Sequence, residues 1–212
     1  MCPYRMMARR YQLVVQMNNM ANIHRDHHRR SIRLQGYDYS QAGAYFVTIV
    51  TRDRTCLFGG VVDGQMQLND HGEIVREEWL RTAQMRPNVT LDAFVIMPNH
   101  VHGIIILHER TTPDGRGTLQ RAPTLEHFGK PTSNSIPTIV RLFKSATTKR
   151  INIARTMPGI AVWQRNYYEH IVRDEGSLNR IREYIETNPC QWAVDRENPD
   201  GNPRSTAEHW EI

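Results

Sequence analysis

Residues 94–107, FVIMPNHVHGIIIL, constrain the fold of this chain more than any other stretch. Two apolar runs flank Pro98 and Asn99. Proline sets the first central backbone angle of a tight turn and asparagine tolerates the second, so the pair suits a reversal between strands. The stretch therefore predicts a β-hairpin.

The second strand of this hairpin carries two histidines. Side chains at alternate positions of a strand leave the same face, so His100 and His102 should lie side by side while Val101 points into a core. Two imidazoles on a rigid strand can hold one divalent metal ion. Two unrelated polar positions beside a turn would give the same pattern.

Length, charge and cysteine content limit the class of protein. A chain of 212 residues is long enough for one domain with a real core. The net charge of +5 and the pI of 9.3 favour an acidic partner such as nucleic acid. The scattered cysteines, Cys2, Cys56 and Cys190, suit a reducing cytosol and predict a cytoplasmic protein. No run is apolar enough to predict a membrane span or a signal peptide, so no membrane partner is expected.

Composition divides the chain into three parts. Residues 1–30 are basic and weakly patterned, which predicts a flexible extension: either an arm on DNA or a disordered, misassigned start. Residues 31–192 form the predicted domain, in which 108–135 read as a long mobile loop. Residues 193–212 predict a loosely ordered tail.

Apolar periodicity predicts alternating strands and helices. Besides the hairpin at 94–107, strands are expected at 45–51, at 56–68 as a pair around Asp63-Gly64, and at 167–173. Helices are expected at 69–85, 136–152 and 178–187, the last with Ser177 as its N-cap. The second helix carries a basic edge, which suits either phosphate contacts or simple solvation: Arg141, Lys144, Lys149 and Arg150.

The last helix holds a second polar pair. Tyr184 and Asn188 are four residues apart, so they lie on one face, a turn apart. A tyrosine hydroxyl and an amide oxygen would then project together. Taken alone, the pattern favours structural roles, with Tyr184 as an aromatic at the core edge and Asn188 as a capping residue before Pro189.

Five segments in this order resemble the REP-associated tyrosine transposases, the single-tyrosine HUH group related to small insertion-sequence transposases. They are RRSIRLQGYDYSQAGAYFVTIVTRDRTCLF (29–58), FVIMPNHVHGIIIL (94–107), VRLFKSATTKRIN (140–152), VWQRNYYEHIVRDE (162–175) and REYIETNP (182–189). The resemblance implies the HUH endonuclease fold, a ferredoxin-like α+β sandwich with a central antiparallel sheet and helices on one face.

The same resemblance implies a role for each polar residue. His100, His102 and Asn188 would bind a divalent metal, and Tyr184 would be the nucleophile. Mg²⁺ or Mn²⁺ suits phosphoryl transfer, although two imidazoles also accept Zn²⁺. The implied activity is metal-dependent nicking and strand transfer of single-stranded DNA through a 5′-phosphotyrosine intermediate. Tyr167 and Tyr168 are weaker alternative nucleophiles, because they lie on a strand with no ligand four residues further on.

The implied partner is single-stranded or hairpin DNA, since family members recognise hairpins at repeated extragenic palindromes. Phosphate contacts are expected from Arg165 and from the basic edge at Arg141, Lys144, Lys149 and Arg150. Trp163 or Tyr168 would stack on unpaired bases, with core packing as the alternative for Trp163. Monomer and homodimer both remain open.

Two other functions use the same residues. One is a domesticated hairpin-DNA-binding protein without turnover. The other is a metal-dependent hydrolase that has no covalent step and does not use Tyr184.

Overall fold

A four-stranded antiparallel sheet forms the centre of the computed structural model, which describes residues 37–109 and 132–201. Its strands are β1 (Gly43–Val50), β4 (Val89–Ile96), β5 (His100–Leu107) and β6 (Tyr168–Val172). Their order across the sheet is β4-β5-β1-β6, and each neighbouring pair is antiparallel. The strands expected from apolar patterning, including the hairpin around Pro98 and Asn99, are therefore confirmed.

Three helices cover the sheet. They are α2 (Asp70–Gln84), α3 (Ile136–Ala154) and α4 (Glu175–Thr187). Along the chain the order β1-α2-β4-β5-α3-β6 is the repeated β-α-β pattern of a ferredoxin-like fold. The predicted α+β fold class, with its central antiparallel sheet, is confirmed.

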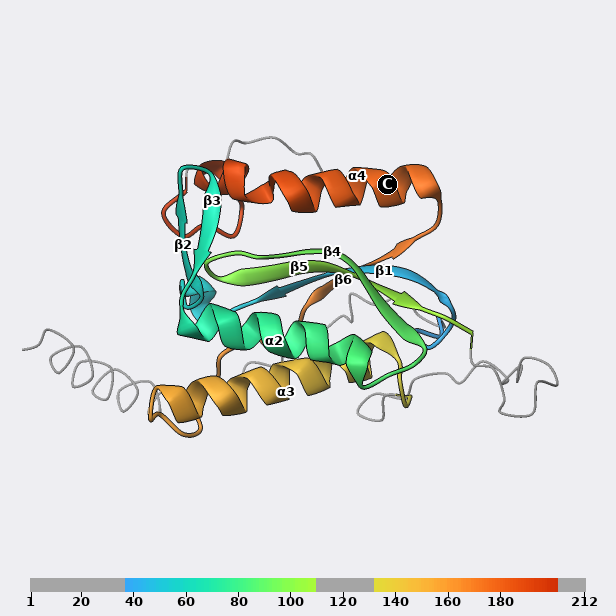
Figure 1. Cartoon of the computed structure of the whole chain (residues 1–212), viewed down its shortest axis with the longest axis horizontal. Helices are drawn as coiled ribbons and strands as arrows, with labels where there is room; N and C mark the ends of the chain where they lie inside the picture. The colour runs from blue at the N-terminus through green and yellow to red at the C-terminus, as the bar shows by residue number, and fades with distance from the viewer. Residues whose placement is uncertain (1–36, 110–131, 202–212) are drawn as a thin grey trace, which may run out of the picture. The chain divides into compact units, whose positions relative to one another are not determined.

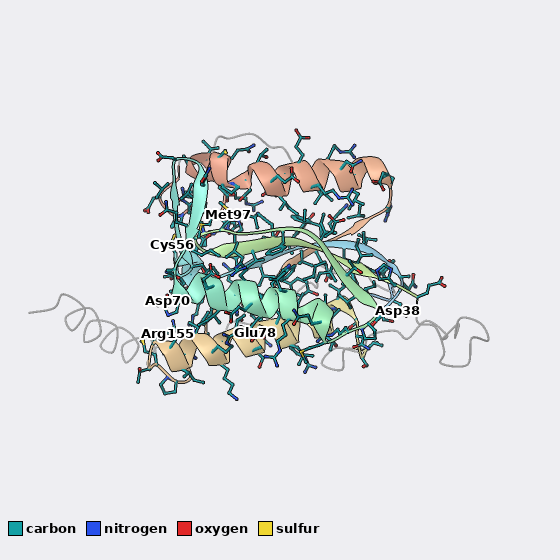
Figure 2. All side chains as sticks on the ribbon, viewed as in Figure 1. Asp38, Cys56, Asp70, Glu78, Met97 and Arg155 are labelled. Atoms are coloured by element: carbon teal, nitrogen blue, oxygen red, sulfur yellow. The ribbon has the colours of Figure 1, made fainter. Side chains whose placement is uncertain are left out.

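The prediction that the helices lie on one face of the sheet is wrong, because they cover both faces. Figure 1 shows α2 and α3 beneath the sheet and α4 above it. Each face has its own apolar cluster, one containing Trp79 and Phe143 from the lower layer and the other Ile181 and Ile185 from α4. Side chains of both layers fill the space against the strands (Figure 2). The reason is that the sheet presents apolar side chains on both faces, so both must be covered.

Alternation along β5 sends its histidines toward α4. Val101 and Ile105 join the cluster beneath the sheet, whereas Ile104 packs with α4 on the opposite face. Gly103 faces the lower layer, where a Cβ would lie 2.3 Å from Cζ2 of Trp79. His100 and His102 have the parity of Ile104, so they face α4.

Short elements frame one end of the sheet. The hairpin of β2 (Gly59–Val62) and β3 (Gln65–Leu68) turns at Asp63 and Gly64, whose positive φ values of 51° and 74° suit the predicted tight turn. Two 3₁₀ segments, η1 (Arg52–Arg54) and η2 (Asn188–Val194), follow β1 and α4.

The start of α4 differs from the prediction of a Ser177 N-cap. Asp174 is the N-cap, and its carboxylate accepts a hydrogen bond from the backbone N–H of Ser177 at 2.8 Å. The helix therefore begins three residues earlier than periodicity indicated, because the acidic side chain satisfies its first free N–H groups.

Several predictions fall partly or wholly outside the described residues. The basic extension at 1–30 lies outside them, as does most of the loop at 108–135. Residues 193–201 of the predicted loose tail are described, and two of them accept hydrogen bonds: Glu197 from Asn99 and Asp195 from Asn188. Within the described ranges, no helix is long and apolar enough to cross a membrane.

Candidate functional site

The two histidines are buried side by side where β5 faces α4. His100 is fully buried and His102 is 4% exposed. Their ring centroids lie 4.4 Å apart at an interplanar angle of 69°. The strand thus brings together the pair that its i, i+2 spacing predicted.

A polar side chain orients each imidazole through its Nδ1 atom. Nδ1 of His100 lies 2.8 Å from Oδ1 of Asn99, and an amide oxygen can only accept, so this nitrogen carries the proton. Nδ1 of His102 lies 2.9 Å from Oγ1 of Thr48, its partner across the β1–β5 ladder. Both rings are therefore fixed with Nε2 pointing away from these partners, as in metal-binding histidines.

Tyr184 reaches the histidine pair from α4. Its hydroxyl lies 3.0 Å from Nε2 of His102, and the two ring centroids are 5.0 Å apart. Phe46 of β1 stacks on His102 and meets Tyr184 edge-on, which supports both rings. The predicted nucleophile and one predicted metal ligand, His102, therefore lie within hydrogen-bonding distance across the sheet–helix interface.

Asn188, one turn after Tyr184, closes the same site. Its side chain is 1% exposed, and its Nδ2 donates to Oδ2 of Asp195 at 3.2 Å. Among the described residues, neither Oδ1 of Asn188 nor Nε2 of His100 has a hydrogen-bond partner. A buried polar atom without a partner is costly, so these two atoms are suited to bind a ligand.

Asp195 is a further group at this point that sequence analysis did not single out. One ligand atom each from His100, His102 and Asp195 all lie within 4.8 Å of one another. Asp195 follows η2, which continues the chain beyond Pro189 and folds it back toward the site. Its place in a polar tail provided no signal, because only the tertiary contact distinguishes it from other acidic residues there.

Burial keeps both imidazoles neutral. It lowers the pKa of His100 to about 4, although nearby Glu197 and Asn188 oppose the shift. It also lowers the pKa of His102 well below its usual range, with the charge of His100 acting in the same direction. Neutral imidazole is the form that binds a metal ion.

Burial shifts the pKa values of Tyr184 and Asp195 in the opposite direction, upward. Burial raises the pKa of Tyr184, and the nearby carboxylates of Asp195 and Glu197 add to the effect. Burial likewise raises the pKa of Asp195. Without a cation in the site, the tyrosine is therefore held as the neutral phenol at pH 7.

These residues fit a divalent metal. Two neutral imidazoles, one amide oxygen and one carboxylate form a mixed nitrogen and oxygen donor set, which suits Mn²⁺, Mg²⁺ or Zn²⁺. The two unpartnered buried atoms, Nε2 of His100 and Oδ1 of Asn188, would gain the partner that they lack.

Three residues predicted to contact DNA have structural partners instead. Trp163 is 7% exposed, packs on Phe58 and Phe143, and donates from Nε1 to Thr147 Oγ1, so it is a core residue and the stacking prediction is wrong. This outcome is the alternative, core packing of Trp163, that the sequence also allows.

Lys144 and Arg150 also have partners within the protein. Lys144 Nζ donates to the backbone carbonyls of Gln164, Arg165 and Asn166. Arg150 pairs with Glu77 and Glu78 and so links α3 to α2. Both cations meet acceptors on neighbouring elements, which helical periodicity does not reveal.

The remaining predicted DNA contacts stay predictions. Arg141, Lys149 and Arg165 are exposed. Tyr168 is 42% exposed and meets Phe46 edge-on, which places it beside the histidine site on the edge strand β6. Its exposed ring is available for stacking on a base.

The antiparallel sheet and the histidine pair opposite Tyr184 agree with what the resemblance to the single-tyrosine HUH group implies. No protein-family model matches the chain. An uncharacterized protein of Haemophilus influenzae is 48% identical over 172 residues, covering 80% of this chain and 93% of that protein. A second protein of that organism, named "Putative REP-associated tyrosine transposase", is 28% identical over 154 residues, covering 73% of this chain and 74% of that protein.

The chain belongs to the same family as the first of these relatives, and the second confirms its resemblance to the REP-associated tyrosine transposases. Among solved structures, the chain is similar to a REP-associated tyrosine transposase bound to a REP hairpin. That similarity covers 77% of this chain and 72% of the other, at 19% identity and a TM-score of 0.46.

Proposed function

We propose that the chain is a metal-dependent transposase that nicks single-stranded DNA and transfers the strand through a 5′-phosphotyrosine, at hairpins of repeated palindromic elements. The observation that carries this proposal is the position of the Tyr184 hydroxyl, 3.0 Å from Nε2 of His102. Beside it lie the unpartnered Nε2 of His100 and Oδ1 of Asn188. A nucleophile next to metal-ligand atoms is the arrangement that a phosphoryl-transfer site needs.

The residues of the site have separate roles in this mechanism. His100, His102 and Asn188 would hold the metal, with Asp195 as a further oxygen ligand. The chemistry that a divalent cation would supply there is that of a Lewis acid on the scissile phosphate. Asn99 and Thr48 orient the imidazoles by occupying their Nδ1 atoms. Burial of the histidine pair keeps water away from the two imidazoles.

The chemical step is a transesterification. The Tyr184 oxygen attacks the phosphorus and loses its proton as the new P–O bond forms. The bond from phosphorus to the 3′ oxygen of the preceding nucleotide breaks, and that oxygen takes up a proton. The products are a 5′-phosphotyrosine and a free 3′-hydroxyl. A 3′-hydroxyl of another strand can reverse the step, so joining needs no external energy source.

The first prediction tests the nucleophile. Tyr184→Phe should abolish the covalent adduct and cleavage while leaving DNA affinity within about twofold, because only one hydroxyl is lost. If Tyr184 were structural, the change would cost about 1 kcal/mol of stability and activity would persist. The substrate is a labelled palindromic hairpin with single-stranded flanks, incubated with Mn²⁺ or Mg²⁺ and resolved on a denaturing gel.

Tyr168→Phe is the matched control, since its ring also lies beside Phe46 but on β6. It should keep the adduct. An adduct that survives in Tyr184→Phe and disappears in Tyr168→Phe would reverse the assignment. Binding without any cleavage by the wild type would favour the domesticated DNA-binding protein, and cleavage without an adduct would favour the hydrolase.

A further inference from the structure

The 3′ oxygen that leaves phosphorus in the cleavage step must take up a proton. Tyr184 cannot supply it, because its own hydroxyl oxygen forms the new bond. The two histidines are poor donors, because burial keeps their imidazoles neutral. A side chain that gives this proton would act as a general acid, a role that typically contributes about 10²- to 10⁴-fold in rate.

Tyr168 lies in the same cross-strand row of side chains as His102. In the two antiparallel ladders, Thr48 of β1 pairs with His102 of β5 on one side and with Tyr168 of β6 on the other. Residues that are directly opposite each other on neighbouring strands point to the same face of the sheet. A single residue of β1 therefore separates Tyr168 from the histidine whose Nε2 meets the Tyr184 hydroxyl.

The ring of Phe46 contacts both tyrosines of this face. Its centroid lies 6.2 Å from that of Tyr184 and 6.3 Å from that of Tyr168, edge-on in both cases, and it stacks on His102 at 5.5 Å. Tyr184 reaches Phe46 from α4, whereas Tyr168 reaches it from β6. The attacking and leaving oxygens of a phosphoryl transfer lie roughly in line across phosphorus, so nucleophile and proton donor should come from different directions.

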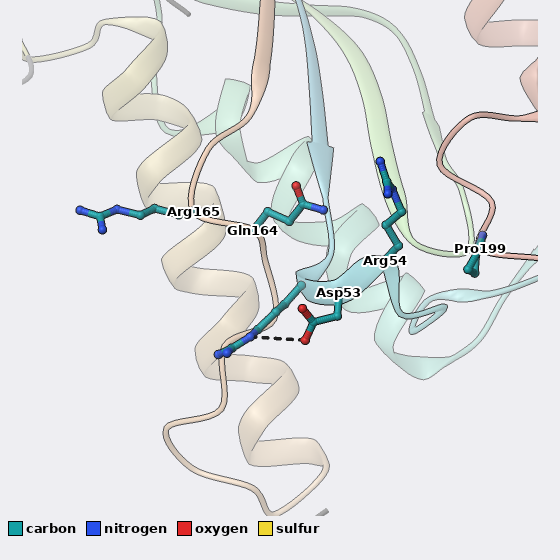
Figure 3. Close-up of a pocket in the computed structure, with 6 residues that line it drawn as sticks. Asp53, Arg54, Gln164, Arg165 and Pro199 are labelled. Atoms are coloured by element: carbon teal, nitrogen blue, oxygen red, sulfur yellow. Dashed lines mark ion pairs between the residues drawn. The ribbon is translucent and has the colours of Figure 1, made fainter. Parts of the chain in front are cut away.

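The segment that leads into β6 is held in place, which fixes the position of Tyr168. Figure 3 shows Gln164 and Arg165 on this segment, beside the end of β1. The backbone N–H of Gln164 donates to the carbonyl of Val50 at 2.9 Å. Lys144 Nζ donates to the carbonyls of Gln164, Arg165 and Asn166, at 2.8, 3.3 and 3.1 Å. A group that is positioned before the substrate binds is more effective in catalysis.

The hydroxyl of Tyr168 is accessible and carries its proton. The residue is 42% exposed, and burial of the rest of its side chain raises the pKa of the phenol above its ordinary value. Tyr168 is therefore neutral at pH 7. A phenol ionises near pH 10 and water only near 15.7, so proton transfer from Tyr168 to a departing alkoxide is favourable.

We propose that the Tyr168 hydroxyl is the general acid that protonates the leaving 3′ oxygen, an assignment that rests on the proposed function. As Tyr184 bonds to phosphorus, its proton passes to water and the bond from phosphorus to the 3′ oxygen breaks. Tyr168 gives its proton to that oxygen, becomes a phenolate and is protonated again by solvent. In the joining direction the phenolate accepts the proton of the attacking 3′-hydroxyl. Only Tyr184 forms a covalent bond to the strand.

The test compares two hairpin substrates that differ in one atom. One has the natural 3′ oxygen at the phosphate that the wild type cleaves, and in the other sulfur replaces that bridging oxygen. Thiols ionise near pH 8.5, so a thiolate can leave without a proton and the sulfur substrate needs no general acid. Single-turnover rates with Mn²⁺ are measured on denaturing gels, and thermal melting confirms that each variant folds.

Tyr168→Phe should slow cleavage of the oxygen substrate by about 100-fold or more and cleavage of the sulfur substrate by no more than about threefold. Phenylalanine keeps the ring, and with it the packing on Phe46 and any stacking on a base. Tyr184 remains in this variant, so its adduct still accumulates on long incubation. His170→Ala is the matched control, because His170 lies on the same strand and pairs with Phe46. It should cleave both substrates at wild-type rates.

Two results would overturn the role of Tyr168 while leaving the proposed function intact. An equal loss of rate on both substrates would mean that the hydroxyl acts through the structure of the site and not on the leaving oxygen. Wild-type rates in Tyr168→Phe on the oxygen substrate would mean that the hydroxyl takes no part. Failure of the wild type to cleave either substrate would instead refute nicking itself, and the general acid with it.

Discussion

At the scale of single residues, Asn99 does more than form a turn. It is fully buried, and its two amide atoms have separate tasks. Oδ1 fixes the proton of His100 on Nδ1, and Nδ2 donates to the carbonyls of Arg54 and Glu197. One side chain thus sets the orientation of a metal ligand and gathers three segments of the chain around it.

Asn99→Ala should therefore weaken metal binding. The Nδ1 atom of His100 would lose its partner, and the ring could then rotate or change tautomer. Loss of such a supporting hydrogen bond typically costs about 10- to 100-fold in metal affinity. Isothermal titration calorimetry with Mn²⁺ measures the change in metal affinity.

Asn152→Ala is the matched control for this prediction. Asn152 is also buried and donates to a backbone carbonyl, that of Ile160, but it lies on α3. The control should lose stability without losing Mn²⁺ affinity. Wild-type affinity in Asn99→Ala would refute the positioning role.

At the scale of elements, an ion pair ties α4 to the sheet near Tyr184. Arg182 binds Asp92 with two hydrogen bonds, Nε to Oδ1 at 3.0 Å and Nη2 to Oδ2 at 2.6 Å. Asp92 lies at the irregularity of β4 between Leu91 and Phe94. Arg182 is two residues before Tyr184, so this pair helps to fix the helix that presents the tyrosine.

Asp92→Asn should lower the free energy of unfolding at about pH 7 by roughly 1 to 2 kcal/mol. The bonds from Arg182 hold the pKa of Asp92 below its ordinary value. Its contribution is thus present above the unfolded-state pKa, near 3.9, and is lost as pH falls through the lower folded-state pKa. Wild type and variant should therefore converge in urea titrations once the pH lies below the folded-state pKa of Asp92.

Glu175→Gln is the control, because Glu175 contacts the same arginine at 3.3 Å but its side chain is 75% exposed. It should change stability by at most about 0.5 kcal/mol. A difference between wild type and Asp92→Asn that persists unchanged at low pH would exclude the ion pair as its cause.

At the scale of the whole molecule, the candidate metal site joins segments that are distant in the sequence. Its groups come from β5, from the end of α4 and from the chain after η2. A ligand that binds only the folded site stabilises the fold, by about 2.7 kcal/mol at a concentration 100 times its dissociation constant. For a protein of this size, each kcal/mol raises Tm by about 2 to 4 °C.

Saturating Mn²⁺ should thus raise Tm by roughly 5 to 10 °C, and a chelator should reverse the shift. His100→Ala should lose most of it, because one ligand is gone. His108→Ala should retain it, since His108 bonds Thr90 at the far end of β5. A shift that is equal in both variants would place the metal elsewhere.

Local sequence patterns determined the elements and the main pair of histidines. Alternation in the stretch HVHGIIIL depends only on strand geometry, so it correctly assigned His100 and His102 to one face and Val101 to the other. Helical spacing likewise put Tyr184 and Asn188 on one face of α4. The resemblance rests on the order of five segments, and the fold class is what that resemblance implies.

Only the tertiary structure decided which partners these residues meet. Lys144 and Arg150 lie on a basic helical edge, yet their acceptors are 20 and 72 residues away in the sequence. Asn99 and Glu197 are separated by 98 residues, and Asp195 reaches the histidines from a polar tail without periodicity. Such contacts depend on how complete elements pack, which the spacing of residues within one element cannot specify.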